Sequence, residues 1–252
     1  MVVDVLSFTT SVTVAVEAGT RVFPYRWRDE TAATFAEDVG ADLAVGRRMA
    51  TASSPWSLSP AALRRAPFTP RLVLPSPNGS AIAASAGELP VIAGALRNAT
   101  AVSQWLVREG YGTTERPIAV IASGERWPDG SLRPAMEDLL GAGAIIAALQ
   151  EQFAKAYVRA QAQAQAHAPA PAHARADADS PAPALSLALS PEASLAAAAF
   201  RTTPDVAAAV TASVSGRELT DGGFAEDVEV ATERDACTAV PVLVDGAFSD
   251  RG

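Results

Sequence analysis

The sequence contains 252 residues and has a net charge of −8, from 20 basic and 28 acidic side chains. That length is enough for one large core or two small ones. The negative charge argues against non-specific nucleic-acid binding, which needs a positive field. The only cysteine, Cys237, cannot form an intrachain disulfide or a cysteine-based zinc site. The two histidines lie in a low-complexity tract, so an enzyme here would use carboxylates, hydroxyls, amides and arginines, with a hard metal ion.

No run of apolar residues is long enough to span a membrane, and the amino-terminal residues lack the pattern of a signal peptide. We therefore expect a cytoplasmic protein with no membrane partner. A strand-like run begins directly at Met1, which suggests a shortened start. The sequence does not determine the oligomeric state, and a homo-oligomer is one of the alternatives.

Short apolar runs alternate with amphipathic stretches along the first 150 residues. The runs predict strands at 2–6, 20–25, 41–45, 71–74, 91–93 and 118–122, and the last looks the most interior. Helices are expected at 8–18, 30–39, 99–109 and 134–150, with a further helix beginning within 81–86. Asp29 and Asn98 are candidate helix caps. This alternation predicts an α/β fold, a layered α/β/α sandwich with a largely parallel or mixed sheet.

The composition changes after residue 150. Residues 161–183 are rich in Ala and Pro and contain almost no large apolar side chain, so they cannot offset the entropy of ordering. We expect an α/β core at 1–150 and a disordered low-complexity insertion at 151–189, whose Ala-Gln start could extend the preceding helix. Residues 190–252 would complete the same domain with helices at 191–200 and 204–213 and a strand at 241–244.

The first motif follows the first predicted strand, where Asp4 is succeeded by Ser7, Thr9 and Thr10. An acid in an apolar strand is costly unless it is paired or bound to a metal. Hydroxyls and free N–H groups at a helix start favour phosphate. The alternative, that the hydroxyls only cap a helix and Asp4 forms a buried ion pair, weighs about the same. Aspartyl-phosphate chemistry would need a second acid at Leu6.

A second motif, Ser76, Asn78, Gly79 and Ser80, lies between a strand and a helix, a suitable position for a phosphate nest, although Asn-Gly is also an ordinary turn. In the third, Gly124 precedes a loop and the adjacent acids Glu137 and Asp138 open an apolar helix. The helix dipole stabilises acids at this position even when they have no function. The alternative is that they bind Mg²⁺.

A fourth motif places Arg217 beside Glu218, ahead of the pair Glu226-Asp227. Arg217 could clamp an anionic oxygen, but a surface ion pair explains it slightly better. Cys237 has no base near it in the sequence and is interpreted as a small buried residue.

Taken in order, these segments resemble the 2-phosphosulfolactate phosphatase family. The resemblance covers nearly all of the chain outside the insertion and rests on VVDVLSFTTSV, LVLPSPNGSAI, AGALRNATAV, AVIASGERWPDGSLRPAMEDLLGAGAII, SGRELTDGGFAEDVEVA and VPVLVDGAF. It implies an α/β fold and Mg²⁺-dependent removal of phosphate from 2-phospho-3-sulfolactate, a small anionic substrate, in coenzyme M synthesis. Carried over by motif, it implies site roles for Asp4, Thr9, Thr10, Asn78, Gly79, Ser80, Asn98, Gly124, Glu137 and Asp138.

Three positions depart from the family pattern. Ser7 stands where the family usually has arginine, Gly46-Arg47-Arg48 replaces Gly-Glu-Arg, and Leu58-Ser59-Pro60 replaces Asn-Ser-Pro. Losing one arginine and gaining another would keep an anion site while reshaping it. The departures would also suit a different phosphate ester or an inactive member.

Our hypothesis from the sequence has Mg²⁺ held by Asp4 and by Glu137 or Asp138, where it binds a phosphoryl oxygen and orients a water. The Asn78-Gly79-Ser80 turn and the Thr9-Thr10 helix start would hold the other oxygens. Arg47, Arg48 or Arg217 would meet a second anionic group. A covalent phosphoenzyme, a related phosphatase of different substrate and a non-catalytic small-anion-binding protein remain alternatives.

Overall fold

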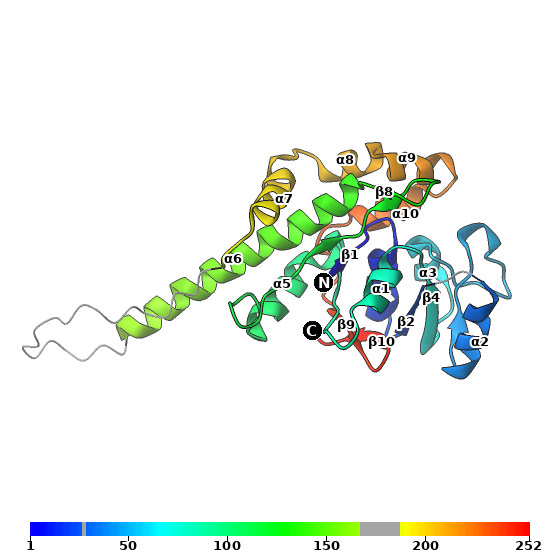
Figure 1. The fold of residues 1–252 in the computed structure, drawn as a ribbon, viewed down its shortest axis with the longest axis horizontal. Helices are drawn as coiled ribbons and strands as arrows, with labels where there is room; N and C mark the ends of the chain where they lie inside the picture. The colour runs from blue at the N-terminus through cyan, green and yellow to red at the C-terminus, as the bar shows by residue number, and fades with distance from the viewer. Residues whose placement is uncertain (27–28, 167–186) are drawn as a thin grey trace, which may run out of the picture.

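The computed structural model describes residues 1–26, 29–166 and 187–252 (Figure 1). Its larger sheet contains, in spatial order, β3 (Asp42–Leu43), β4 (Arg71–Pro75), β2 (Arg21–Tyr25), β10 (Ala247–Asp250) and β9 (Pro241–Val244). Strands β3, β4 and β2 are parallel, whereas β10 is antiparallel to both of its neighbours. The sheet is therefore mixed.

A second sheet consists of three short parallel strands in the order β5 (Ala93–Gly94), β1 (Val2–Val3) and β6 (Ile121–Ala122). An antiparallel bridge between Ile92 and Val242 connects it to the larger sheet. The two sheets therefore adjoin each other, and β6, which precedes the Gly124 motif, lies next to β1.

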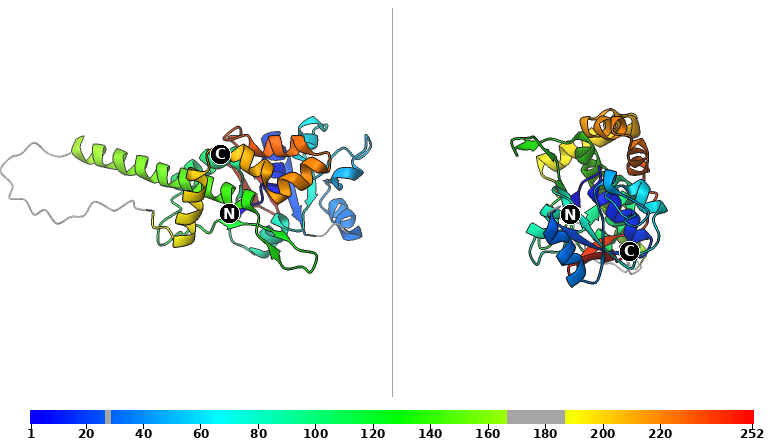
Figure 2. Two further views of the ribbon diagram at one scale, coloured as in Figure 1. Left: turned by 90° about the horizontal axis from the view of Figure 1, so that it is seen from above. Right: turned by 90° about the vertical axis from the view of Figure 1, so that its right-hand side faces the viewer.

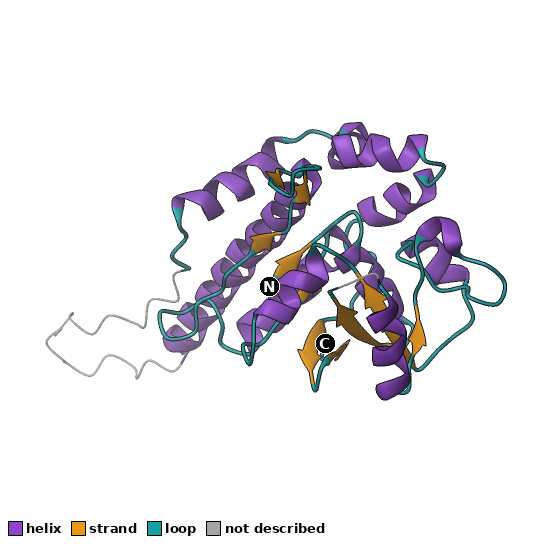
Figure 3. Cartoon of the chain, turned by 45° about the vertical axis from the view of Figure 1, so that its right-hand side comes forward, coloured by secondary structure: helices purple, strands orange, loops and turns teal. Residues whose placement is uncertain are grey.

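Helices cover both faces of the larger sheet, as the alternation of its side chains requires. Leu72 and Leu74 of β4 pack in one cluster with Phe8 of α1 (Phe8–Glu17). Val73, between them, packs with Ala36 of α2 (Glu30–Asp38) on the opposite face. The α/β class is confirmed, with sheets packed against helices (Figure 3).

The smaller sheet is also covered by helices. Val3 and Val5 pack against Ile145 of α6 (Met136–Ala166) and Leu106 of α5 (Ala99–Arg108). A Cβ at Gly141 of α6 would lie 2.6 Å from a methyl carbon of Val5. This glycine therefore lets the amino-terminal part of α6 approach the end of β1 closely.

Shorter elements complete the molecule. They are η1 (Arg47–Met49), α3 (Pro60–Arg65), α4 (Gly79–Ser85), η2 (Leu96–Asn98), the hairpin β7 (Glu125–Arg126) and β8 (Leu132–Arg133), and the helices α7 (Pro191–Thr202), α8 (Val206–Ala212), α9 (Val214–Asp221) and α10 (Ala225–Thr232). Val206, Val210 and Val228 from the last helices share a core cluster with Val3. In the described ranges, no helix is long and apolar enough to cross a membrane.

Several elements differ from the sequence expectations. The run 118–122 was expected to be the most interior strand, but only Ile121–Ala122 is a strand, it lies at a sheet edge, and Ile121 is 43% exposed. Helix α6 continues past residue 150 to Ala166 because Ala and Gln favour helices, and it projects from the body (Figure 2). The expected insertion thus begins as helix, and 167–186 lie outside the described residues.

The return strand β10 was not anticipated. Asp245 and Gly246 between β9 and β10 have φ values of 50° and 75°, the pattern of a tight type I′ hairpin turn. The strand places Phe248 in the core, edge to face with Phe8 at a centroid distance of 6.2 Å.

Candidate functional site

Asp4 follows β1 and connects two helix starts. Its Oδ1 accepts the backbone N–H of Phe8 at 3.0 Å, and its Oδ2 accepts the N–H of Gly79 at 3.0 Å. The Thr9 hydroxyl donates to the Asp4 carbonyl, and the Thr10 hydroxyl donates to the carbonyl of Val5. Both threonine hydroxyls are therefore engaged with the backbone of the turn and hold its shape.

Gly79 begins α4 against this carboxylate. A Cβ there would lie 2.4 Å from a ring carbon of Phe8 and 2.8 Å from Asp4 Oδ2, so only glycine fits. The Ser80 hydroxyl lies between the carbonyls of Tyr25 and Ser76 and donates its one hydrogen to this pair, which fixes the turn after β4. The predicted Ser76–Ser80 turn thus contacts the predicted Asp4 turn directly.

Asp138, in the first turn of α6, connects the ends of two other strands. Its Oδ1 accepts the N–H of Val5 at 2.7 Å, and its Oδ2 accepts the N–H of Gly124 at 2.9 Å. Gly124 has a φ of 70°, which favours glycine. Asp138 therefore positions the end of β1 and the loop after β6 relative to α6.

Two further acids complete an acidic cluster, defined here as Asp4, Glu125, Glu137 and Asp138. Asn78 donates to Glu125 Oε2 at 2.7 Å, which connects the Asn78-Gly79 turn to the β7–β8 hairpin. Glu137 is 2% exposed. Within the described part of the chain, no hydrogen-bond donor reaches its carboxylate. Glu137 is thus the member of the cluster least committed to holding the fold.

Burial and like charge raise the pKa of three of these acids. Desolvation is the largest cause for Asp4, Glu125 and Asp138, and the negative charge of Glu137 raises the pKa of all three further. Backbone N–H groups oppose the shift at Asp4 and Asp138, as does the Asn78 amide at Glu125. The cluster therefore favours a bound proton or a cation.

Two arginines flank the acidic cluster. Arg47 lowers the pKa of Asp4 and Arg133 lowers that of Glu125 through their positive charges. Arg47 Nε donates to Asp227 at 2.9 Å, and its Nη2 donates to the Ser7 hydroxyl. Arg133 forms two hydrogen bonds with Glu218, at 2.8 and 3.0 Å. Opposite charges thus meet where a phosphate ester and a cation could bind together.

The carboxylates of the acidic cluster are the groups that could hold Mg²⁺. Among the described residues, no group of three or more carboxylate, histidine or cysteine side chains could hold a metal ion. Mg²⁺ usually binds through one or two carboxylates plus waters and substrate phosphate, so it does not need such a group. The mutual repulsion of the acids and the free carboxylate of Glu137 fit a cation of this kind.

The structure brings together most of the residues expected from the sequence. Asp4, Ser7, Thr9, Thr10, Ser76, Asn78, Gly79, Ser80, Gly124, Glu137 and Asp138 lie in or directly contact the turns around the acidic cluster.

Three expected residues have other surroundings. The Asn98 side chain is buried and bonds the backbone of Ala93, Ala95 and Ala239, so it does not cap α5. Arg217 is exposed and donates to the carbonyl of Ala212. Arg48 is also exposed.

Sequence reasoning missed three residues: Glu125, Arg133 and Asp227. The first two lie in a segment that was expected to be a loop and that folds into the β7–β8 hairpin. Asp227 was noted only as part of an acidic pair. The signal for Glu125 was its position next to Gly124 after an apolar strand, where polar residues of parallel sheets often converge.

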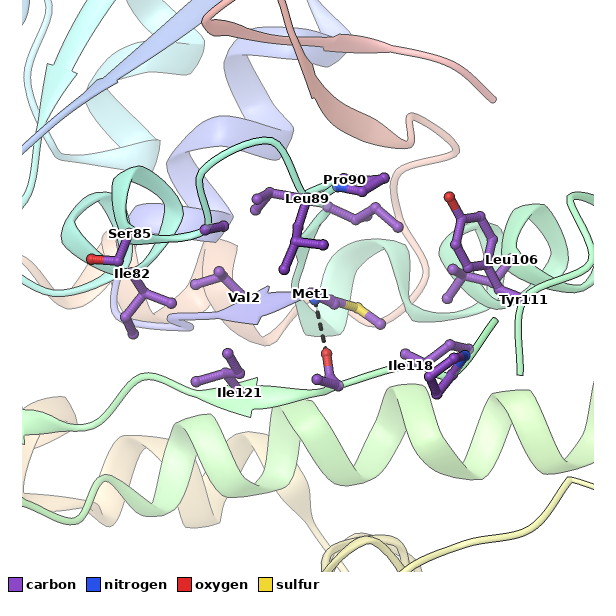
Figure 4. Close-up of a pocket in the computed structure, with 15 residues that line it drawn as sticks. Met1, Val2, Ile82, Ser85, Leu89, Pro90, Leu106, Tyr111, Ile118 and Ile121 are labelled. Carbon is purple, nitrogen blue, oxygen red and sulfur yellow. Dashed lines mark hydrogen bonds between the residues drawn. The ribbon is translucent and has the colours of Figure 1, made fainter. Parts of the chain in front are cut away.

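Two apolar cavities lie apart from these acids. One, of about 370 Å³, opens beside Met1, Leu89 and Ile121 (Figure 4). The other, of about 720 Å³, lies along α6 and α7. No aspartate or glutamate is among the described residues that line the first, and Glu192 is the only one lining the second. The acidic cluster is therefore separate from both of these cavities.

The fold and this site define a mixed α/β protein with an acidic cluster at strand ends, flanked by arginines and helix starts. The family model for 2-phosphosulpholactate phosphatase matches residues 1–246. The chain therefore belongs to the 2-phosphosulpholactate phosphatase family. A search of curated proteins found no match.

Proposed function

We propose that this protein is a Mg²⁺-dependent phosphatase that hydrolyses a small anionic phosphate ester, with 2-phospho-3-sulfolactate as the expected substrate and 3-sulfolactate and phosphate as products. Family membership supports phosphatase chemistry. The observation that carries the proposal is the contact of three separate turns through Asp4, Asn78 and Asp138. With 2-phospho-3-sulfolactate as its substrate, the protein would act in coenzyme M synthesis. We propose that it does so in the cytoplasm.

The binding of the metal would involve Glu137 together with Asp4, and Asp138 would hold the loops around them. Bound Mg²⁺ would neutralise charge on the phosphoryl oxygens and on the acids around it. Asn78 is partly exposed and its amide donates to Glu125, and in the proposed complex this amide would donate to a phosphoryl oxygen. The positive charges of Arg47 and Arg133 would attract the anionic ester before any step occurs.

In the chemical step, a water oxygen would bond to phosphorus as the bond between phosphorus and the ester oxygen breaks. The water proton would pass to a carboxylate, and the departing alkoxide would take up a proton. Glu125 is a candidate proton carrier, because burial raises its pKa and so favours the protonated carboxyl group that a general acid needs. Such transfer depends mostly on positioning and charge, so histidine is not required.

The test is phosphate release by the purified protein from a panel of phosphorylated acids, with Mg²⁺ or with EDTA. We expect release from 2-phospho-3-sulfolactate with Mg²⁺ and its loss with EDTA. Faster release from another phosphorylated acid would make this a related phosphatase of different substrate. Binding of phosphate or sulfolactate with no turnover of any ester would overturn the enzymatic proposal.

A further inference from the structure

Arg47 has surroundings that differ from those of an ordinary surface arginine. Its side chain is 17% exposed, and its partner Asp227 is 1% exposed. The other oxygen of Asp227 accepts the Ser59 hydroxyl and, at 3.2 Å, the N–H of Ala61. A buried carboxylate with three donors in total is thus fixed, and it fixes the guanidinium in turn.

The Arg47 guanidinium keeps donors that these bonds do not use. Nε and one N–H of Nη2 are occupied by Asp227 and Ser7, whereas no described residue accepts a hydrogen bond from Nη1. The Ser7 hydroxyl accepts from Arg47, and its own hydrogen has no acceptor in the described ranges. An arginine fork and a hydroxyl therefore present free donors side by side.

These donors lie next to the acidic cluster, because Phe8, the residue after Ser7, donates its backbone N–H to Asp4 Oδ1 at 3.0 Å. Ser7 is three residues from Asp4 and directly precedes α1. A ligand whose phosphoryl group lies at Asp4 and Asn78 would thus carry its other substituent toward Arg47. A guanidinium fork matches a planar carboxylate well and also binds a sulfonate.

We propose that Arg47 and Ser7 form a second anion subsite, which binds the carboxylate or sulfonate of a small phosphorylated acid and selects such acids over esters without a second charge. Asp227 is the positioning residue of this subsite. The inference rests on the proposed phosphatase function and assigns one part of its substrate. Arg133 is not assigned this role, because its partner Glu218 is 58% exposed and so does not fix the guanidinium as the buried Asp227 fixes Arg47.

Two measurements test the subsite. The first is the binding of 3-sulfolactate, which has no phosphate, by calorimetry. The second compares kcat/KM for 2-phospho-3-sulfolactate, for 2-phospholactate, which has a carboxylate but no sulfonate, and for glycerol phosphate, which has neither. The variants are Arg47→Gln and Arg47→Lys. Arg47→Lys keeps the positive charge opposite Asp227, so it tests the subsite if Arg47→Gln fails to fold. The control is Arg108→Gln, an exposed arginine at the end of α5.

We expect Arg47→Gln to weaken binding of 3-sulfolactate by about 10- to 100-fold and to lower kcat/KM for 2-phospho-3-sulfolactate by a similar factor, mainly through KM. Arg47→Lys should show a smaller loss, and glycerol phosphate should be little affected. A loss for 2-phospholactate would assign the carboxylate to the subsite, and a loss confined to 2-phospho-3-sulfolactate would assign the sulfonate. Arg108→Gln should match the parent protein.

Equal losses for all esters would place Arg47 on the phosphate, and unchanged binding would make it structural; either result overturns the inference. If the parent protein hydrolyses no ester but binds 3-sulfolactate through Arg47, the proposed function fails and the subsite remains. If hydrolysis occurs without this selectivity, the proposed function remains and the subsite fails.

Discussion

At the scale of single residues, the four acids of the cluster divide into two pairs. Asp4 and Asp138 use both carboxylate oxygens to accept backbone N–H groups and so hold three loops together. Glu125 accepts one side-chain amide, and Glu137 accepts no hydrogen bond from the described residues. The aspartates therefore organise the site, and the glutamates keep the most freedom to meet a ligand.

We predict that Asp4→Asn lowers phosphate release by about 100-fold, because it removes a charge proposed to hold Mg²⁺ and turns an amide NH₂ toward a backbone N–H. Initial rates at saturating Mg²⁺ measure the effect, and circular dichroism checks the fold. Asp42→Asn, at an exposed position of β3, is the control and should leave the rate unchanged. A folded Asp4→Asn protein with the parent rate would contradict the role of Asp4.

At the scale of elements, one buried carboxylate connects three of them. Asp227 of α10 bonds Arg47 of η1 and the first residues of α3, where Ser59 is the helix cap. None of these elements is longer than eight residues, so none would be stable alone. Their arrangement depends on this shared contact.

We expect Asp227→Ala to reduce the free energy of unfolding by about 3–5 kcal/mol, because it leaves Arg47 partly buried without its counter-charge. Urea denaturation followed by circular dichroism measures this. Glu226, the preceding residue, pairs with Arg65 in an exposed position. Glu226→Ala should therefore cost no more than about 1 kcal/mol. Similar losses for the two variants would show that the Asp227 contacts carry no special stability.

Local sequence patterns correctly predicted the helices whose first residue is set by a neighbouring residue in the sequence. Helices α1 and α2 begin as expected, and Asp29 caps α2 by accepting the N–H of Thr31. The sequence hypothesis grouped the Asp4 turn with the Asn78-Gly79-Ser80 turn, and Asp4 does accept the N–H of Gly79, although β1 and β4 belong to different sheets. The exposure of β6 did not follow, because an apolar run reads the same at an edge and in the interior.

The rest of the site depends on contacts between residues far apart in sequence. Asp227 meets Arg47 across 180 positions and Asn78 meets Glu125 across 47. No periodicity or spacing in one sequence encodes such pairs. Two of the departures from the family pattern illustrate this, since Ser7 and Arg47 look unrelated in the sequence yet bond each other, and Arg47 also bonds Asp227.

At the scale of the whole molecule, the chain carries a net charge of −8 and also buries several of its acids in one place. Concentrated burial of like charges is unfavourable for stability unless protons or a cation compensate. The site is therefore expected to make the stability of the entire fold depend on pH and on Mg²⁺.

For the metal-free protein, we predict that stability falls as pH rises from about 4 toward neutrality. Asp4, Glu125 and Asp138 have a raised pKa in the folded state, so that state binds more protons than the unfolded chain over this window. The melting temperature in EDTA, measured at several pH values, should fall accordingly, and Mg²⁺ should restore more of it at higher pH. A melting temperature that rises with pH and ignores Mg²⁺ would contradict this.

The most direct test of the account is phosphate release from 2-phospho-3-sulfolactate by Glu137→Gln, compared with Glu88→Gln at an exposed position. Because the Glu137 carboxylate accepts no hydrogen bond from the described residues, the change should remove charge at the site with little effect on the fold. The account predicts that Glu137→Gln folds normally, has a Mg²⁺-dependent rate about 10- to 100-fold lower than the parent protein, and needs a higher Mg²⁺ concentration. Glu88→Gln should match the parent protein in all three respects. An unchanged rate and an unchanged Mg²⁺ requirement in Glu137→Gln would contradict it.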